Sequence, residues 1–263
     1  MFVLVSRRLE RLWRQFGAGV AFSLFGIGGL LLTMFVFPAI NLVFRDRSQG
    51  AAAAQRMVHL TWKLFVWIIV VLGVIDFETQ GADLLNGEKG TLVIANHPSL
   101  LDVVLIMSMM HRTQCVVKPG VWKNPFMRGV IKAANYIPNL GDPERTLSDC
   151  VSALKAGNNL VIFPEGSRTV AGRQRHLERG FANIAIRSGA PIRLVTVSCV
   201  PVLMAKGDKW YTSPQRKPRY QICVRDRIDP AIFTGSDIPS RAARNLTAQI
   251  ARRFEELIPN ERA

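Results

Sequence analysis

Two long apolar segments lie near the start of the chain. Phe16 to Phe44 is a run of 29 residues without a charge, and Leu64 to Ile75 is a second run of 12. About 20 helical residues cross a bilayer, so the first run is long enough. The second gives only about 18 Å of helix for about 30 Å of hydrocarbon. We predict two apolar helices within residues 1–80.

Basic residues flank the first apolar run on both sides. They are Arg7, Arg8, Arg11 and Arg14 before it and Arg45, Arg47 and Arg56 after it. Two full spans would place the second group on the wrong side under the positive-inside tendency. We therefore expect a helical hairpin that dips into one leaflet, with both basic groups at the same surface. The alternative is that both runs are buried core helices of a soluble protein.

From Gly81 onward, short β-rich runs alternate with helical patterns. The strand candidates are Thr91–Ala95, Gln114–Val117, Asn159–Phe163, Ile192–Val202 and Arg219–Val224. The helical patterns are Ser99–His111, Pro125–Ala134, Pro143–Ala156, His176–Ser188 and Ser240–Leu257. This alternation is typical of an α/β fold. We predict a mixed, mostly parallel sheet flanked by helices in residues 81–263, preceded by a membrane-associated two-helix motif in residues 1–80.

The composition indicates a folded and strongly basic protein. Hydrophobic residues make up 49% of the chain, which excludes a disordered chain, and 34 Lys and Arg face 19 Asp and Glu for a net charge of +15. Of that charge, +11 follows Gly81. A basic protein is expected to have an anionic partner. Nucleic acid is disfavoured, because the sequence shows no stacking-aromatic motif or recognition helix.

The cysteines indicate the compartment. Cys115, Cys150, Cys199 and Cys223 lie far apart, with no C-x-x-C motif and no His nearby at metal-binding spacing. We expect reduced thiols, no metal site and no cofactor, as in a cytosol-facing domain. A cleaved signal peptide is not expected, because the first apolar run is long and Arg45 follows it without a small-residue cleavage site. We predict a membrane-associated protein at the cytoplasmic face of the inner membrane.

The first strand candidate ends in polar residues. Asn96, His97, Pro98 and Ser99 follow Ala95, and Asp102 lies on the first turn of the next predicted helix. The separation spans a strand-to-helix turn, so the Asp102 carboxylate can fold back onto the His97 ring. The Ser99-x-x-Asp102 pattern is also that of a helix cap.

A second strand candidate also ends in a polar turn. Asn159–Phe163 is followed by Pro164, Glu165, Gly166, Ser167 and Arg168. Gly166 permits a positive φ, and the planar guanidinium of Arg168 suits a phosphate or a carboxylate. The alternative is a surface turn with a Glu–Arg ion pair of little consequence.

Together, the two blocks resemble a known family. N-H-P-S-L-L-D at 96–102 and F-P-E-G-S-R-T at 163–169 are similar to the H-x-x-x-x-D and F-P-E-G-[ST]-R blocks of the glycerolipid acyltransferases, the 1-acylglycerol-3-phosphate acyltransferase family. The resemblance runs from about Gly81 to Val202. Between the blocks, Lys118-x-x-x-x-Lys123-x-Pro125-x-x-x-Gly129 resembles the stretch that positions the acceptor in that family.

The resemblance implies transfer of a fatty acyl group from a thioester to a lipid hydroxyl. The donor would be acyl-CoA or acyl carrier protein, and the acceptor a lysophospholipid such as 1-acylglycerol-3-phosphate. His97 would be the general base and Asp102 its partner. A thiolate leaves readily because its conjugate acid has a pKa near 8.5, whereas the hydroxyl proton must be removed. The implied substrate-binding residues are Asn96, Lys118, Glu165, Gly166, Ser167 and Arg168.

Two departures from the family pattern leave alternatives open. Where the family has a phosphate-contacting Arg, this chain has Tyr136-Ile137-Pro138-Asn139, and Leu194 replaces the second proline of the last block. Another lysolipid, such as a lyso-amino-acid lipid or a specialised lipid, is therefore an alternative acceptor. A non-catalytic membrane lipid-binding module is a second alternative. A serine hydrolase using Ser99 or Ser167 is a third, although neither serine lies in a G-x-S-x-G elbow.

Overall fold

Seven strands form one mixed sheet in the computed structural model, which describes residues 2–169, 176–209, 211–235 and 238–258. The strands are β1 (Asp76–Gln80), β2 (Leu92–Ala95), β3 (Thr113–Val117), β4 (Ile137–Pro138), β5 (Asn159–Ile162), β6 (Ile192–Val200) and β7 (Arg219–Ile228). Their order across the sheet is β1-β7-β6-β2-β5-β3-β4, and every pair is parallel except β6 with β7. The predicted mixed, mostly parallel α/β fold is confirmed.

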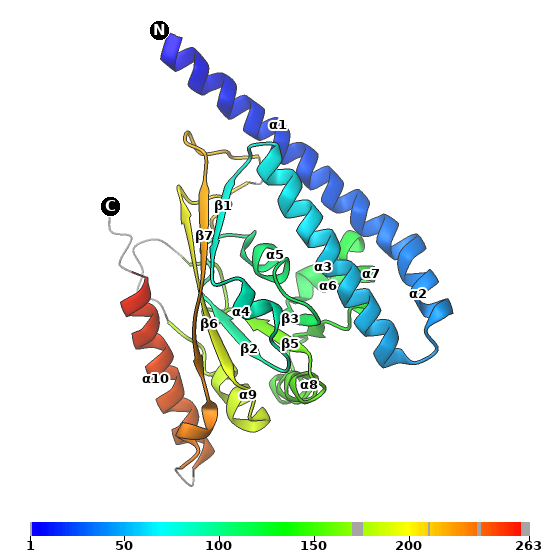
Figure 1. The fold of residues 1–263 in the computed structure, drawn as a ribbon, viewed down its shortest axis with the longest axis vertical. Helices are drawn as coiled ribbons and strands as arrows, with labels where there is room; N and C mark the ends of the chain where they lie inside the picture. Colours follow the sequence, from blue (N-terminus) through cyan, green and yellow to red (C-terminus); the bar gives the residue numbers. More distant parts are fainter. Residues whose placement is uncertain (1, 170–175, 210, 236–237, 259–263) are drawn as a thin grey trace.

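Helices cover both faces of this sheet (Figure 1). In chain order they are α1 (Phe2–Leu31), α2 (Phe37–Val43), α3 (Arg47–Val71), α4 (Asp83–Asn86), α5 (Asp102–Met107), α6 (Pro119–Lys123), α7 (Pro125–Ala133), α8 (Pro143–Lys155), α9 (Gly180–Ser188) and α10 (Pro239–Leu257). A π-helical turn, Leu32–Val36, joins α1 to α2, and a 3₁₀ turn, Pro230–Phe233, precedes α10.

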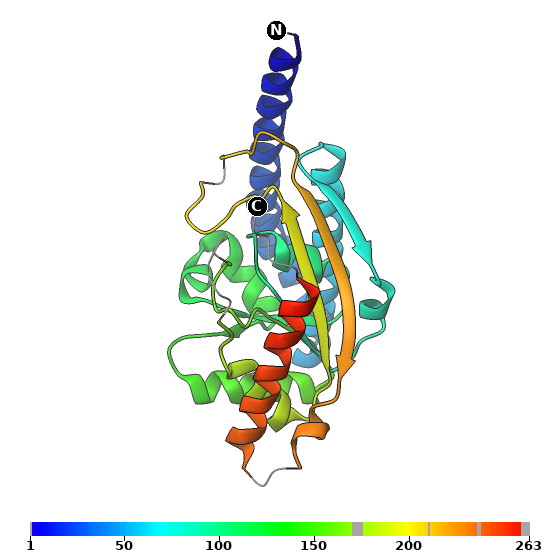
Figure 2. The ribbon, with the colours of Figure 1, turned by 90° about the vertical axis from the view of Figure 1, so that its left-hand side faces the viewer.

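Strand β2 shows why its sequence is apolar throughout. Val93 and Ala95 pack into the core shared with α3, α5 and α7, whereas Leu92 and Ile94 pack into the core shared with α8, α9 and α10. Successive side chains of a strand point to opposite faces, so a strand covered on both sides needs apolar residues at every position. Figure 2 shows the two layers, with α10 in front of the sheet and α1 to α3 behind it.

Most predicted elements lie within a few residues of their expected bounds. Two strands were not predicted: β4 has only two residues, and β1 is an edge strand with mostly exposed side chains. The helix expected from Ser99 begins at Asp102, because Ser99 lies in the turn that follows the strand. Strand β1 pairs with β7 just before the expected domain boundary between residues 80 and 81, and that boundary stays a prediction.

The N-terminal region forms an antiparallel helical hairpin of α1–α2 and α3 (Figure 1). The segments Arg8–Val43 and Arg47–Val71 are each long and apolar enough, by length and composition, to cross a membrane. The first is largely exposed, which contradicts the alternative in which both runs are buried core helices. Whether the hairpin dips or spans stays a prediction.

The second apolar helix is longer than predicted. Helix α3 begins 17 residues before Leu64, so the argument that it is too short to cross a bilayer was wrong. Two of its polar residues face the protein: the Gln55 amide donates to the carbonyl of Ala134 at 3.1 Å, and His59 Nδ1 lies 3.2 Å from the Met107 oxygen. The charge-free run stops at Lys63, which is exposed on the other side of the helix, and so underestimates the length of α3.

The basic residues before the first apolar run are partly bound within the protein. Arg11 donates to the carbonyl of Ser213 at 3.0 Å, and Arg14 donates to the carbonyls of Pro214 and Gln215 at 3.2 and 2.8 Å. Arg14 is buried. These two side chains anchor α1 to the segment between β6 and β7, whereas we expected them to face a membrane surface.

Glycines allow α1 to approach α7 closely. A Cβ built on Gly29 would lie 2.5 Å from the carbonyl oxygen of Phe126, and one built on Gly129 would lie 2.1 Å from the side chain of Thr33. No side chain fits at either position without movement of the neighbouring helix. Gly129, in the block expected to position the acceptor, therefore has a packing role.

Candidate active site

His97 and Asp102 form a hydrogen-bonded pair where β2 ends and α5 begins. His97 Nδ1 lies 2.8 Å from Asp102 Oδ2, and the same oxygen accepts the backbone N–H of Ser99 at 2.7 Å. Asp102 is fully buried, whereas the His97 side chain is 18% exposed. The predicted fold-back of the carboxylate onto the imidazole is what the structure shows.

Burial determines the electrostatics of Asp102. Loss of water raises the pKa of its carboxyl group, and the hydrogen bonds from His97 and Ser99 oppose this only in part. The second oxygen, Oδ1, is buried and has no hydrogen-bond partner among the residues that the structure describes. The carboxylate is therefore directed at His97, whose Nδ1 it occupies, and Nε2 is the ring nitrogen left for a proton transfer.

Phe163 supports the other side of the imidazole. The rings of His97 and Phe163 stack with centroids 4.1 Å apart and planes inclined by 23°. Phe163 directly follows β5, and β5 pairs with β2, so the two residues meet at the same edge of the sheet. No role was predicted for Phe163, although its place at the start of the F-P-E-G block was an available signal.

Glu165 holds the backbone of His97. Its Oε1 accepts the His97 N–H at 3.1 Å, and its Oε2 accepts the Thr169 hydroxyl at 2.7 Å. The Thr169 N–H donates to the carbonyl of His97 at 2.7 Å. Both backbone groups of His97 are thus bound by the second block. Thr169 was not among the predicted site residues.

The turn after β5 has the predicted backbone shape. Gly166 has φ +65°, a conformation that glycine adopts without strain. The ammonium group of Lys118 donates to the Gly166 carbonyl at 2.6 Å, so the block between the two motifs reaches the second one. The Ser167 hydroxyl makes a weak contact of 3.5 Å with the carbonyl of Arg168.

Arg168 and Asn96 bind protein backbone. Nη1 of Arg168 donates to the carbonyls of Met204 and Ala205 at 2.7 and 3.0 Å. The buried Asn96 amide donates to the carbonyl of Val197 and accepts its N–H, both at 2.7 Å, which joins the end of β2 to β6. Substrate-binding roles for these two residues stay predictions.

Ser99 is buried and fully engaged. Its hydroxyl donates to the carbonyl of Leu203 at 2.7 Å and contacts the hydroxyl of Tyr220 on β7. Burial raises the pKa of Tyr220 well above its ordinary value, so the phenol is neutral. Ser99 faces away from solvent and bonds to groups other than His97, which excludes it as the nucleophile of a hydrolase.

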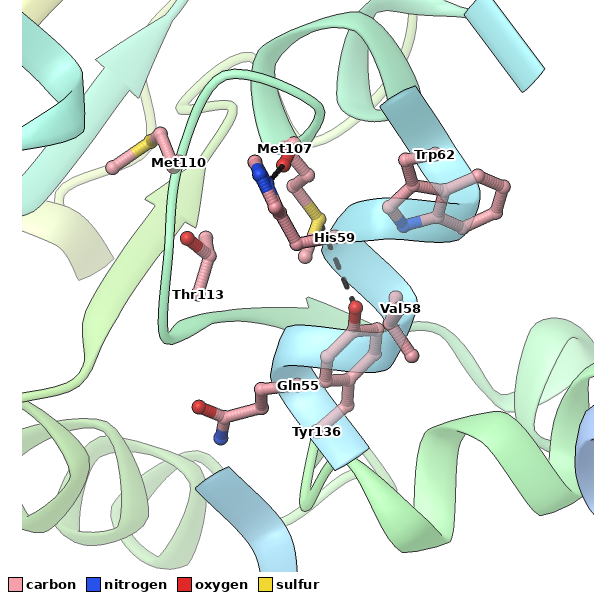
Figure 3. A pocket seen from close by; sticks show the side chains of 8 residues that line it. All are labelled: Gln55, Val58, His59, Trp62, Met107, Met110, Thr113 and Tyr136. Atoms are coloured by element: carbon pink, nitrogen blue, oxygen red, sulfur yellow. Dashed lines mark hydrogen bonds between the residues drawn. The ribbon is translucent and has the colours of Figure 1, made fainter. Parts of the chain in front are cut away.

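A buried cluster links α3 to α5, the helix that carries Asp102 (Figure 3). Gln55, His59 and Trp62 of α3 face Met107 of α5 and Tyr136. The side chains leave no room for a water-sized molecule between them, so the cluster is packed core. Through it the second apolar helix supports the site helix directly.

Comparison with known proteins gives a consistent result. Residues 76–204 match the family model described as Acyltransferase. The chain is 25% identical over 137 residues to a chloroplastic 1-acyl-sn-glycerol-3-phosphate acyltransferase of Brassica napus, an alignment over 50% of this chain and 40% of that protein. It is 24% identical over 217 residues to a 1-acyl-sn-glycerol-3-phosphate acyltransferase of Pseudomonas aeruginosa, over 80% and 78% of the two chains.

A solved structure shares the fold. The 1-acyl-sn-glycerophosphate acyltransferase PlsC of Thermotoga maritima superposes with a TM-score of 0.71 at 21% identity, over 96% of this chain and 98% of that one. The alignments with the plant relatives span less than half the length of those proteins. The expected resemblance to glycerolipid acyltransferases is confirmed.

Proposed function

We propose that the chain, whose residues 76–204 match the Acyltransferase family model, transfers a fatty acyl group from a thioester to the hydroxyl of a lysophospholipid such as 1-acylglycerol-3-phosphate. The thioester would be carried on coenzyme A or acyl carrier protein. The observation that carries this proposal is the 2.8 Å contact between His97 and the buried Asp102. A histidine that is oriented by a buried carboxylate and partly exposed to solvent is suited to act as a general base.

The bonds change in one sequence. His97 Nε2 takes the proton of the acceptor hydroxyl while its oxygen attacks the thioester carbonyl carbon. The tetrahedral intermediate then collapses, the C–S bond breaks and the thiolate leaves, after which His97 gives its proton to the thiolate or to water. A thiolate needs little protonation because the pKa of its conjugate acid is near 8.5. Asp102 stabilises the imidazolium that forms, and Glu165 and Thr169 keep the His97 backbone in place.

The second block supplies the groups for the acceptor. Nε and Nη2 of Arg168 have no hydrogen-bond partner among the residues that the structure describes, so they remain for a phosphate. Ser167 and the turn at Gly166 lie beside Arg168, and Lys118 stabilises that turn by its hydrogen bond to the Gly166 carbonyl. The stretch Tyr136 to Asn139 lacks the family's arginine, which supports a lyso-amino-acid lipid or specialised lipid as the alternative acceptor.

The acceptor would be reached from a membrane. Helix α1 exposes a series of large apolar side chains: Leu9, Leu12, Trp13, Phe16, Leu24, Ile27 and Leu31. Exposed apolar surface of this extent marks a membrane or partner contact. We propose membrane association through the helical hairpin, with the catalytic domain at the cytoplasmic face of the inner membrane.

The test compares wild type with His97→Ala. We expect His97→Ala to abolish acyl transfer from a thioester while the protein still fractionates with membranes, and the exposed His111→Ala to serve as the matched control with activity retained. Transfer by His97→Ala at the wild-type rate would disprove the assignment. Mass spectrometry of lipids from cells with either version identifies the acceptor, and lipid binding without turnover of any acceptor would indicate the non-catalytic module.

A further inference from the structure

A basic hollow lies between the starts of α9 and α10. Arg179, Ile238, Ser240, Arg241 and Arg244 line it, and its volume is about 230 Å³. The three arginine side chains are exposed. Among the described residues, none of them has a carboxylate within 4.0 Å. The hollow therefore gathers three positive charges without a neutralising partner in that part of the chain.

The N-termini of α9 and α10 add to the electrostatic repulsion among the three arginines. Arg179 immediately precedes α9, and Arg241 and Arg244 lie in the first two turns of α10. Neither helix has a side-chain cap or an acidic residue in its first turn. A helix N-terminus carries a partial positive charge, so cations there oppose the dipole as well as one another. A bound anion would relieve both repulsions.

The position of the hollow disfavours a membrane headgroup as its ligand. Helices α9 and α10 cover the face of the sheet opposite to α3 and α5, and Figure 2 shows α10 on the far side from the apolar hairpin. A ligand would arrive from the aqueous side. The planar guanidinium group of arginine can donate two parallel hydrogen bonds to a phosphate. A concave space of this size fits a small phosphorylated ligand better than it fits the flat surface of a partner protein.

The hollow is also connected to the active-site edge. The N–H of Glu178, the residue before Arg179, donates to the carbonyl of Pro164 at 2.8 Å. Pro164 precedes Glu165, whose carboxylate binds the His97 N–H. One hydrogen bond and two peptide links thus separate Arg179 from the residue that holds the general base.

We propose that this hollow binds the phosphate groups of a soluble phosphorylated acyl donor, namely coenzyme A, a proposal that rests on the proposed function. The guanidinium groups of Arg179, Arg241 and Arg244 would bind the phosphates while the pantetheine arm carries the thioester toward His97. The hollow then acts as a donor site, separate from the acceptor groups around Arg168.

Titration calorimetry with free coenzyme A tests the site on the full chain in detergent. We expect Arg241→Ala/Arg244→Ala to weaken binding at least tenfold, and Arg241→Lys/Arg244→Lys to restore part of it. Arg252→Ala removes another exposed arginine of α10 and is the matched control, with affinity within twofold of wild type. With acyl-CoA, the double alanine variant should raise the KM for the donor and leave kcat within twofold.

Several results would overturn the proposal. Unchanged coenzyme A affinity in Arg241→Ala/Arg244→Ala would do so, as would inorganic phosphate binding as tightly as coenzyme A, which would indicate a simple anion site. If Arg241→Ala/Arg244→Ala weakened the binding of acyl carrier protein but not that of coenzyme A, the ligand of the hollow would be acyl carrier protein and the proposal would be wrong. Asp237, the acidic residue before Ile238 in the sequence, lies outside the described residues, and a loss of affinity in Asp237→Asn would also contradict the proposal.

Free coenzyme A binding needs no catalysis, so the two proposals fail separately. His97→Ala should bind coenzyme A as wild type does. A wild-type chain that binds coenzyme A but transfers no acyl group would refute the proposed function and leave the site intact.

Discussion

Asp102→Asn should have opposite effects on the catalytic rate and on the stability of the fold. The substitution keeps the size of the side chain and removes the charge that faces His97 Nδ1 at 2.8 Å. The Ser99 N–H donates to Asp102 Oδ2 at 2.7 Å in the wild type, and the amide oxygen of the variant can still accept this hydrogen bond. The fold should therefore survive while the stabilisation of the His97 imidazolium is lost.

The expected loss of kcat lies between about 10-fold and about 10⁴-fold. A hydrogen bond to a charged acceptor contributes about 1.5–3 kcal/mol and a neutral one about 0.5–1.5, so loss of the charge alone costs at least about tenfold. If the amide instead turns its N–H toward Nδ1, it selects the wrong tautomer of His97 and gives up the hydrogen bond from Ser99, because both groups contact the same oxygen of Asp102. In a Ser-His-Asp triad the same change lowers kcat by about 10⁴.

Stability should change in the opposite direction. Burial raises the pKa of Asp102, so the ionised carboxylate destabilises the fold relative to the protonated one. As pH rises from the unfolded pKa of about 3.9 through the raised folded pKa, the wild type loses stability that the amide variant does not lose. The Tm of Asp102→Asn minus that of wild type should therefore increase from acid to neutral pH.

Two measurements check this reasoning. Thiol release from an acyl thioester in the presence of acceptor gives kcat, and thermal unfolding in detergent across a pH series gives Tm. Asp149→Asn, an exposed carboxylate of the same domain, is the control for both. A kcat within threefold of wild type would refute the role of Asp102, and a Tm difference independent of pH would refute the electrostatic argument.

Three further predictions test the supporting structure. Glu165→Gln exchanges the carboxylate that accepts the His97 N–H at 3.1 Å for a neutral amide, and should lower kcat about tenfold with a smaller change in acceptor KM; equal effects on both would contradict a positioning role. Ser99→Ala leaves the buried Tyr220 hydroxyl with fewer partners, and should cost about 1–3 kcal/mol in urea unfolding while folded protein keeps its activity; loss of kcat would reopen the serine hydrolase. Gly29→Ala places a Cβ 2.5 Å from the Phe126 carbonyl and should cost about 1–3 kcal/mol, whereas Gly28→Ala, with nothing within 4 Å, should stay near wild type; equal melting temperatures would contradict the close packing of α1 on α7.

The sequence alone determined the class of fold and the two halves of the site. Strands β2 and β5 are covered on both faces, so each is an apolar run that can be recognised without the structure. The polar residues that follow such strands meet at one edge of the sheet, because the strands are parallel neighbours. The pairing of His97 with Asp102 was predictable for the same reason: five residues across a strand-to-helix turn leave few arrangements.

Only the tertiary structure decided the features that depend on distant backbone. Strand β1 has the polar sequence D-F-E-T-Q, and it is a strand because it pairs with β7, more than 130 residues later. The role of Glu165 follows from a hydrogen bond to the His97 backbone N–H, which no side-chain pattern encodes. The length of α3 was hidden because the charge-free run stops at Lys63, an exposed residue within the helix.

The hollow lined by Arg179, Arg241 and Arg244 is the clearest feature that only the tertiary structure decided. Arg179 and Arg241 lie far apart in the sequence, in two helical patterns that the periodicity predicted separately. Each arginine alone is a solvated cation on a basic protein. Packing of α9 against α10 brings their uncapped ends together, and charge repulsion at close range depends on that packing, because Coulomb energy falls with distance through space and not along the chain.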